Sequence, residues 1–164
     1  MITIVEAQPN EYNLIQNIVY ATWPIAYGEI LSKEQLDYML AKFYSIEALN
    51  KNVQDGHCFL LAKEGDETLG FIGYENGYTN LPITKIHKIY ILSETQGKGI
   101  GKLLIDKVQE VAKANHSDKL SLNVNRFNMA RNFYAKLGFE ITKSEDIAIG
   151  NGYLMEDYVM EKPL

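Results

Sequence analysis

Cysteine occurs only once in this sequence of 164 residues, and the single Cys58 excludes an internal disulfide. Cys58 lies in an apolar run typical of a buried strand, which favours a structural thiol over a catalytic one. No stretch of about 18 apolar residues is present, so we expect no membrane span. The first residues show no basic region followed by an apolar stretch, so no secretory signal is visible. We therefore expect a cytoplasmic protein.

Basic residues are also few. Sixteen Lys and Arg stand against 21 Asp and Glu, which leaves a net charge of −5. Nucleic-acid surfaces need clustered Lys and Arg, so we expect no nucleic-acid partner. The charged and hydrophobic fractions, 23% and 46%, are ordinary for a globular protein. No repeat or linker divides the chain, and we predict one domain over residues 1–164.

The order of the hydrophobic patterns predicts a mixed α/β fold. One helix is expected from about Pro9 until Pro24 ends it, and a second after the capping-box pattern that begins at Ser32. Further helices are expected at 100–112 and 130–137. The predicted strands cover residues 2–5, 57–63, 68–74, 84–92, 120–125, 139–142 and 153–161. Helices come early, a meander follows, and strands alternate with helices at the end, as in an α/β sheet.

The most informative segment is a turn with three alternating glycines, Gly97, Gly99 and Gly101, between a strand and a helix. Glycines let a ligand approach the backbone closely, and the helix N-terminus offers free N–H groups. With Lys98 and Lys102 beside them, these features favour a phosphate or pyrophosphate site over an ordinary turn. A P-loop would need Ser or Thr after the lysine, and a Rossmann turn would need different glycine spacing.

This turn resembles the Gln/Arg-x-x-Gly-x-Gly/Ala signature of the GNAT superfamily of N-acetyltransferases. The matching residues are Gln96-Gly97-Lys98-Gly99-Ile100-Gly101. A second segment resembles the family's Asn…Ala…Phe-Tyr…Leu-Gly-Phe block: Asn128-Met129-Ala130-Arg131-Asn132-Phe133-Tyr134-Ala135-Lys136-Leu137-Gly138-Phe139. More weakly, the early helices and the closing residues 150–160 look like the bacterial spermidine/spermine (PaiA-type) branch.

The resemblance implies a GNAT-like α+β domain with a central mixed, mostly antiparallel, twisted sheet of about six to seven strands flanked by helices. It also implies acetyl-CoA as co-substrate: the strand backbone pairs with the pantetheine arm, and the turn amides hold the pyrophosphate. The family asparagine usually stands seven residues before the tyrosine, and here either Asn125 or, ranked first, Asn128 takes that place. The implied cofactor-binding residues are Ile89, Tyr90, Ile91, Gln96, Gly97, Lys98, Gly99, Ile100, Gly101, Lys102, Asn125 and Asn128.

Tyr134 matches the family tyrosine that protonates the departing CoA thiolate, so it is the expected general acid. Attack on the thioester needs a neutral amine, and His87 on the cofactor strand is the candidate base, directly or through water. A histidine merely packed at the sheet surface is an equal alternative. A backbone N–H of the cofactor strand, at Ile91, is expected to stabilise the oxyanion. His57, beside a predicted turn, is expected to be solvated, and no metal is expected.

The expected function is transfer of an acetyl group to a primary amine of a small molecule or peptide. A polyamine leads among the acceptors, because the chain is acidic and its closing segment carries Glu145, Asp146, Glu156 and Asp157. The rival is a non-catalytic acyl-CoA-binding or sensing module on the same fold. The oligomeric state stays open, a homodimer among the options.

Overall fold

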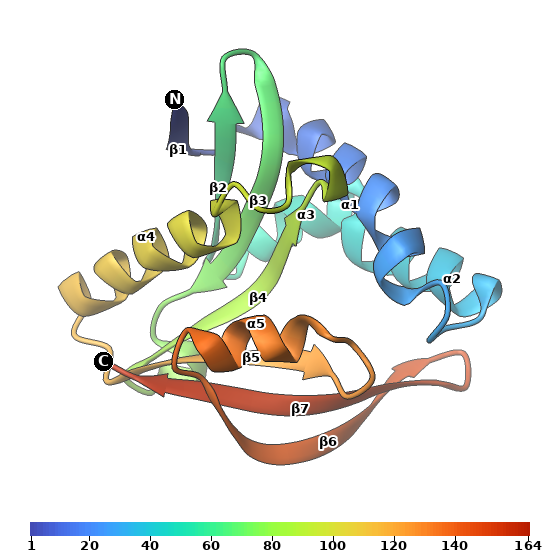
Figure 1. Ribbon diagram of the computed structural model, residues 1–164. Helices are drawn as coiled ribbons and strands as arrows, with labels where there is room; N and C mark the ends of the chain where they lie inside the picture. Colours follow the sequence, from blue (N-terminus) through green and yellow to red (C-terminus); the bar gives the residue numbers. More distant parts are fainter.

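The seven predicted strands form one sheet in the computed structural model, which describes residues 1–164 (Figure 1). Their order is β1-β2-β3-β4-β5-β7-β6, and every neighbouring pair is antiparallel except β4 and β5. This confirms the expected mixed, mostly antiparallel sheet. The strands are β1 (Ile2–Glu6), β2 (His57–Glu64), β3 (Glu67–Glu75), β4 (Ile83–Ile91), β5 (Lys119–Asn125), β6 (Glu140–Gly150) and β7 (Tyr153–Pro163).

Helices cover both faces of the sheet, with α1–α3 on one side and α4 on the other (Figure 1). Each face has its own hydrophobic core. One core joins α1–α3 to side chains such as Phe59 and Phe71, and the other joins α4 and α5 to side chains such as Ile72 and Leu122. The helices are α1 (Tyr12–Tyr27), α2 (Lys33–Tyr44), α3 (Ile46–Gln54), α4 (Ile100–Ala114) and α5 (Ala130–Lys136), with short 3-10 turns at Pro9–Glu11, Tyr78–Asn80 and Ser93–Thr95.

The sheet divides between its two parallel strands. β4 and β5 pair only at four positions, from Ile83↔Lys119 to Ile86↔Leu122. Beyond them, β4 continues to residue 91 paired with β3 alone, and β5 continues to residue 125 paired with β7 alone. One edge of residues 87–91 therefore has no strand partner, and backbone groups on that edge remain available to a ligand.

A β-bulge lies just before this division. Gly73 of β3 opposes Lys88, and the next residue Tyr74 opposes Ile86, which leaves His87 as the extra residue of β4. A bulge shifts the alternation of side chains between the two faces. Ile86 therefore packs in the α4 core, whereas the Lys88 ammonium lies over aromatic rings on the α1–α3 face.

Two boundary predictions are wrong. α1 does not end at Pro24 but continues to Tyr27, and the Gly28 N–H donates to the Pro24 carbonyl (3.0 Å). Proline removes only its own N–H, and the carbonyl it would have met belongs to the exposed Tyr20, so its loss does not leave a deeply buried residue without a partner. β6 runs to residue 150 rather than 142, because pairing with β7 makes it a strand although it is mostly exposed. None of the helices combines the length and the apolar character that a membrane crossing requires.

Candidate active site

Two adjoining cavities occupy the place where β4 and β5 separate. The larger, of about 780 Å³, is lined by residues of α1, β4, the glycine turn, β5 and α5. The smaller, of about 240 Å³, is lined mostly by α1, α2, β4 and β7. We call them the turn cavity and the aromatic cavity. Five residues line both: Tyr27, His87, Lys88, Tyr90 and Asn123.

The glycine turn forms one end of the turn cavity. Gly97 and Gly99 have φ angles of +91° and +74°, which side chains rarely adopt, and a Cβ at either would meet nothing within 4 Å. Gly101 is needed for a different reason, since a Cβ there would lie 2.9 Å from the Phe133 ring. The first helical hydrogen bond of α4 runs from the Leu103 N–H to the Gly99 carbonyl. The three amides before Leu103 therefore have no partner inside the helix and suit an anion.

The structure separates the predicted cofactor residues into two groups. Ten of the twelve line the turn cavity: Ile89, Tyr90, Ile91, Gln96, Gly97, Gly99, Ile100, Gly101, Lys102 and Asn128. Lys98 does not line it, because its ammonium lies 3.4 Å from a Glu64 carboxylate oxygen. Asn125 lines the aromatic cavity instead, and its side chain accepts a hydrogen bond from the Phe127 N–H (2.9 Å). Of the two candidate asparagines, Asn128 is therefore the one in the turn cavity.

Tyr134 lies in the wall of the turn cavity on α5. Its ring packs edge-on against Phe133 and Phe139, and only 8% of the residue is exposed. Burial raises the pKa of the Tyr134 hydroxyl well above its ordinary value of about 10. The phenol is therefore protonated throughout the neutral range, which is the state a proton donor needs.

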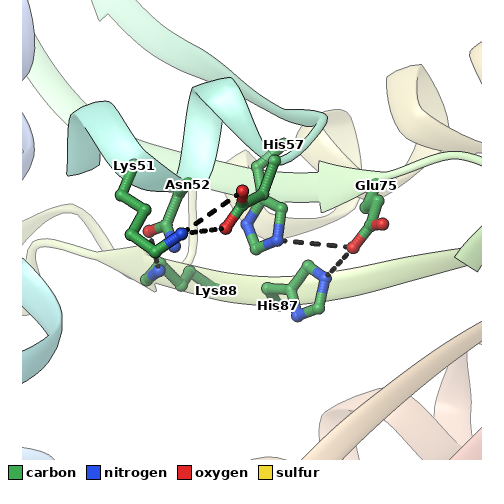
Figure 2. Close-up of polar contacts among 7 residues, drawn as sticks. Lys51, Asn52, His57, Glu75, His87 and Lys88 are labelled. Atoms are coloured by element: carbon green, nitrogen blue, oxygen red, sulfur yellow. Dashed lines mark hydrogen bonds and ion pairs between the residues drawn. The ribbon is translucent and has the colours of Figure 1, made fainter. Parts of the chain in front are cut away.

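His87 belongs to a compact cluster with His57 and Glu75, drawn from three neighbouring strands (Figure 2). The same Glu75 oxygen lies 3.0 Å from His87 Nε2 and 3.3 Å from His57 Nε2. The two imidazole rings are stacked, with centroids 4.1 Å apart and planes 4° from parallel. The expectation that His57 is solvated is wrong, since its side chain is 14% exposed and its Nδ1 is buried without a partner. The sequence did not reveal the burial of His57, because His57 lies beside a turn and only the pairing of β2 with β3 brings it opposite Glu75.

Burial and nearby lysines lower the pKa of both histidines. The pKa of His87 falls to about 4, mainly by burial and also through Lys88 and Lys85. The pKa of His57 falls to about 4, mainly by burial and then through His87 and Lys88. Both rings are therefore neutral at pH 7, and His87 can donate its Nε2–H to the Glu75 carboxylate, while His57 Nε2 only lies near the same oxygen. Figure 2 shows the second ring nitrogen of His87 pointing away from Glu75.

The same three residues are the one group whose donor atoms could hold a metal ion, since they lie within 4.8 Å of one another. Metal ligands must direct their lone pairs toward one point. The parallel, stacked rings of His57 and His87 direct their nitrogen lone pairs in parallel directions instead. The arrangement thus suits a hydrogen bond from His87 to Glu75, beside the stacked His57 ring, better than it suits a metal in its present geometry.

Few of the closing carboxylates face a cavity. Asp157 lines the aromatic cavity, is buried, and accepts a hydrogen bond from the Asn123 side chain (3.2 Å). Glu145 pairs with Lys143 at 2.6 Å, and Asp146 pairs with Arg126 at 2.6 Å. Glu156 lines neither cavity. The acidic cluster expected from the sequence therefore contributes a single carboxylate to the cavity walls.

Comparison with known proteins agrees with this geometry. The family model described as acetyltransferase (GNAT) domain matches residues 29–162. An uncharacterized N-acetyltransferase of Archaeoglobus fulgidus is 31% identical over 81 residues, covering 46% of this chain and 55% of that protein. The aligned region thus spans about half the length of this curated relative.

Solved structures show the same fold over the whole chain. The PaiA N-acetyltransferase of Thermoplasma acidophilum, solved in complex with coenzyme A, superposes with a TM-score of 0.84 at 24% identity, covering 100% of this chain and 99% of that one. A GCN5-related N-acetyltransferase of Rhodopseudomonas palustris also gives 0.84, at 20% identity, covering 99% and 95%.

The class of protein defined by this fold and this cleft is an N-acetyltransferase domain. The family match extends over more than half of the sequence, and the chain belongs to the GNAT acetyltransferase family.

Proposed function

We propose that residues 1–164 act as one N-acetyltransferase domain that moves the acetyl group of acetyl-CoA to a primary amine in a ternary complex. The observation that carries this proposal is the cleft between β4 and β5. Free amides lie at one end of it, an unpaired strand edge runs along it, and Tyr134 stands in its wall. The pyrophosphate would bind the amides, and the pantetheine arm would lie along residues 89–91 as an added strand.

Tyr134 is the proposed general acid. When the amine displaces CoA, the leaving thiolate takes a proton, and a buried phenol in the cavity wall can supply it. The backbone N–H of Ile91 is the proposed donor to the tetrahedral oxyanion, since Ile91 lines the same cavity. No covalent enzyme intermediate is needed, because the two substrates would bind in adjoining cavities and react directly.

His87 is the proposed base, and Glu75 its positioning residue. His87 lines both cavities, so it stands where an amine entering one would meet a thioester held in the other. Glu75 accepts the Nε2–H at 3.0 Å, which leaves the lone pair on Nδ1 to take a proton, directly or through water. The lowered pKa keeps the ring neutral at any pH above about 4 but also makes it a weak base, so the proton would pass on to water rather than stay on Nδ1.

The acceptor is proposed to enter through the aromatic cavity. The expectation of a polyamine stays a prediction, and it draws support from one cavity carboxylate, Asp157. A panel of amines that includes spermidine, amino acids and a peptide N-terminus, each mixed with acetyl-CoA, tests the function by thiol release. Acetyl-CoA-dependent release with at least one amine supports the enzyme. CoA binding without turnover of any amine would leave the non-catalytic acyl-CoA module.

A further inference from the structure

Lys88 lines both cavities, and its ammonium has no acidic partner. No carboxylate lies within 4 Å of its ammonium, although nine ion pairs between Lys or Arg and a carboxylate occur in the protein. The ammonium donates one hydrogen bond, to the Asn52 side chain (2.7 Å), as Figure 2 shows. It lies 5.3 Å from the Tyr44 ring centre and 5.7 Å from that of Phe59. A partly buried charge that lacks a counter-ion is unfavourable, so a ligand anion there would stabilise it.

Trp23 supplies a second donor without an acceptor. Its ring lines the aromatic cavity and packs edge-on against Tyr44, the same ring that lies under the Lys88 ammonium. The indole N–H is buried and has no hydrogen-bond partner in the protein. An unmade hydrogen bond of this kind is costly, so the N–H would be stabilised by any acceptor that the packing around the ring admitted.

The rest of the aromatic cavity selects an apolar ligand of modest size. Its other lining side chains include Leu31, Met39, Phe43 and Met155. The cavity measures about 240 Å³, and a cavity of about 150 Å³ is enough to bind benzene. It therefore has room for one aromatic or branched group with a short polar end.

We infer that the aromatic cavity binds a primary amine that also carries a carboxylate and an apolar group, with the carboxylate paired to Lys88. Asp157, the single acidic side chain lining this cavity, leaves it with one carboxylate and one ammonium. A zwitterion matches that pair, whereas a polycation would bring an ammonium toward Lys88. The lowered pKa of Lys88, about 8 because of burial, agrees with a charge that lacks a partner. This inference rests on the proposed acetyl transfer and names its acceptor class.

The test compares L-phenylalanine with phenethylamine, which lacks the carboxylate, in the wild type and in Lys88→Met. Methionine keeps the chain length and removes the charge. The two amines differ in pKa, so the deciding quantity is the change in their kcat/KM ratio between the two proteins. We expect Lys88→Met to lower that ratio at least about tenfold, the effect of losing a hydrogen bond to a charged group.

Wild-type binding provides a measurement that does not depend on turnover or on the variant. We expect 3-phenylpropanoate, which has the ring and carboxylate but no amine, to bind in the presence of CoA, and its amide to bind at least about tenfold more weakly. An unchanged ratio in a folded Lys88→Met, or equal binding of the acid and the amide, would overturn the inference. Better turnover of spermidine than of every carboxylate-bearing amine would do the same. Absence of thiol release with all amines would instead count against the proposed function, while the binding comparison still decides the anion site.

Discussion

Gly99→Glu provides the sharpest test of the pyrophosphate site, because the chain offers a matched control. Gly99 precedes the first residue of α4 and lines the turn cavity. Gly65 lies in the turn between β2 and β3 and lines neither cavity. Their φ angles are +74° and +61°, and a Cβ at either position would meet nothing within 4 Å. Gly65→Glu therefore introduces the same side chain into the same kind of backbone, away from the site.

Both variants should lose similar stability. Holding a side chain in the left-handed region costs about 1–2 kcal/mol, and in a protein of this size each kcal/mol lowers Tm by about 2–4 °C. Comparable decreases in Tm would show that both variants fold with the expected strain. Their difference in ligand affinity can then be assigned to the position of the carboxylate.

The affinity for CoA should fall in Gly99→Glu alone. Two unit charges about 5 Å apart repel by about 1 kcal/mol in water and about 3 kcal/mol at an effective dielectric constant of about 20. The pyrophosphate carries more than one charge, and 1.36 kcal/mol corresponds to tenfold in affinity, so we expect Kd for CoA to rise at least about tenfold. Isothermal titration of the wild type and both variants measures this. Equal affinity of all three folded proteins would refute the site.

The remaining expectations concern the catalytic groups. Tyr134→Phe keeps the ring between Phe133 and Phe139, so kcat should fall by about 10²–10⁴-fold while the Kd of acetyl-CoA stays near wild type; near-normal turnover with chemistry rate-limiting would remove Tyr134 from the mechanism. Glu75→Gln should lower kcat with little change in the KM of acetyl-CoA, and a loss confined to KM would count against a positioning role. The folded state holds the pKa of His57 and His87 at about 4 instead of 6.5. Between these pH values the unfolded chain binds more protons, so Tm should fall as the pH drops from about 6.5 to about 4. An unaltered dependence of Tm on pH in His57→Gln would contradict this. Dialysis against EDTA should leave kcat unchanged, because the stacked rings do not converge on one ion, and a loss restored by added zinc would show a metal requirement.

Local patterns were sufficient for most of the fold. The alternation of apolar residues predicted all seven strands, and the Ser32 cap is present, since its hydroxyl accepts the Gln35 N–H at 3.1 Å. These features depend on residues close together in the chain. β6 was predicted too short because its last residues are exposed and carry little hydrophobic signal. Its strand character comes from pairing with β7.

In the candidate site, too, local features were predictable from the sequence and long-range contacts were not. The glycine turn is a local feature and was found in the sequence because backbone conformation and helix termini are set by neighbouring residues, whereas Tyr134 was found through the resemblance of its segment to the family block. The polyamine expectation relied on counting carboxylates near the end of the chain, and counting does not reveal which of them are paired. Lys143 and Arg126 neutralise Glu145 and Asp146. Only Asp157 remains in a cavity wall.

By itself the sequence determined an α/β fold with a glycine turn that opens a helix, because those properties follow from short-range periodicity and from glycine at defined positions, while the resemblance of two segments to family motifs indicated an acetyltransferase. Only the tertiary structure decided what surrounds the two cavities. Strand pairing brings His57 and Glu75 opposite each other from residues 18 positions apart in the chain. The bulge at His87 moves Lys88 onto the aromatic face, where no acidic side chain meets it. Contacts of this kind depend on sheet register, and a change of one residue in register sends a side chain to the opposite face.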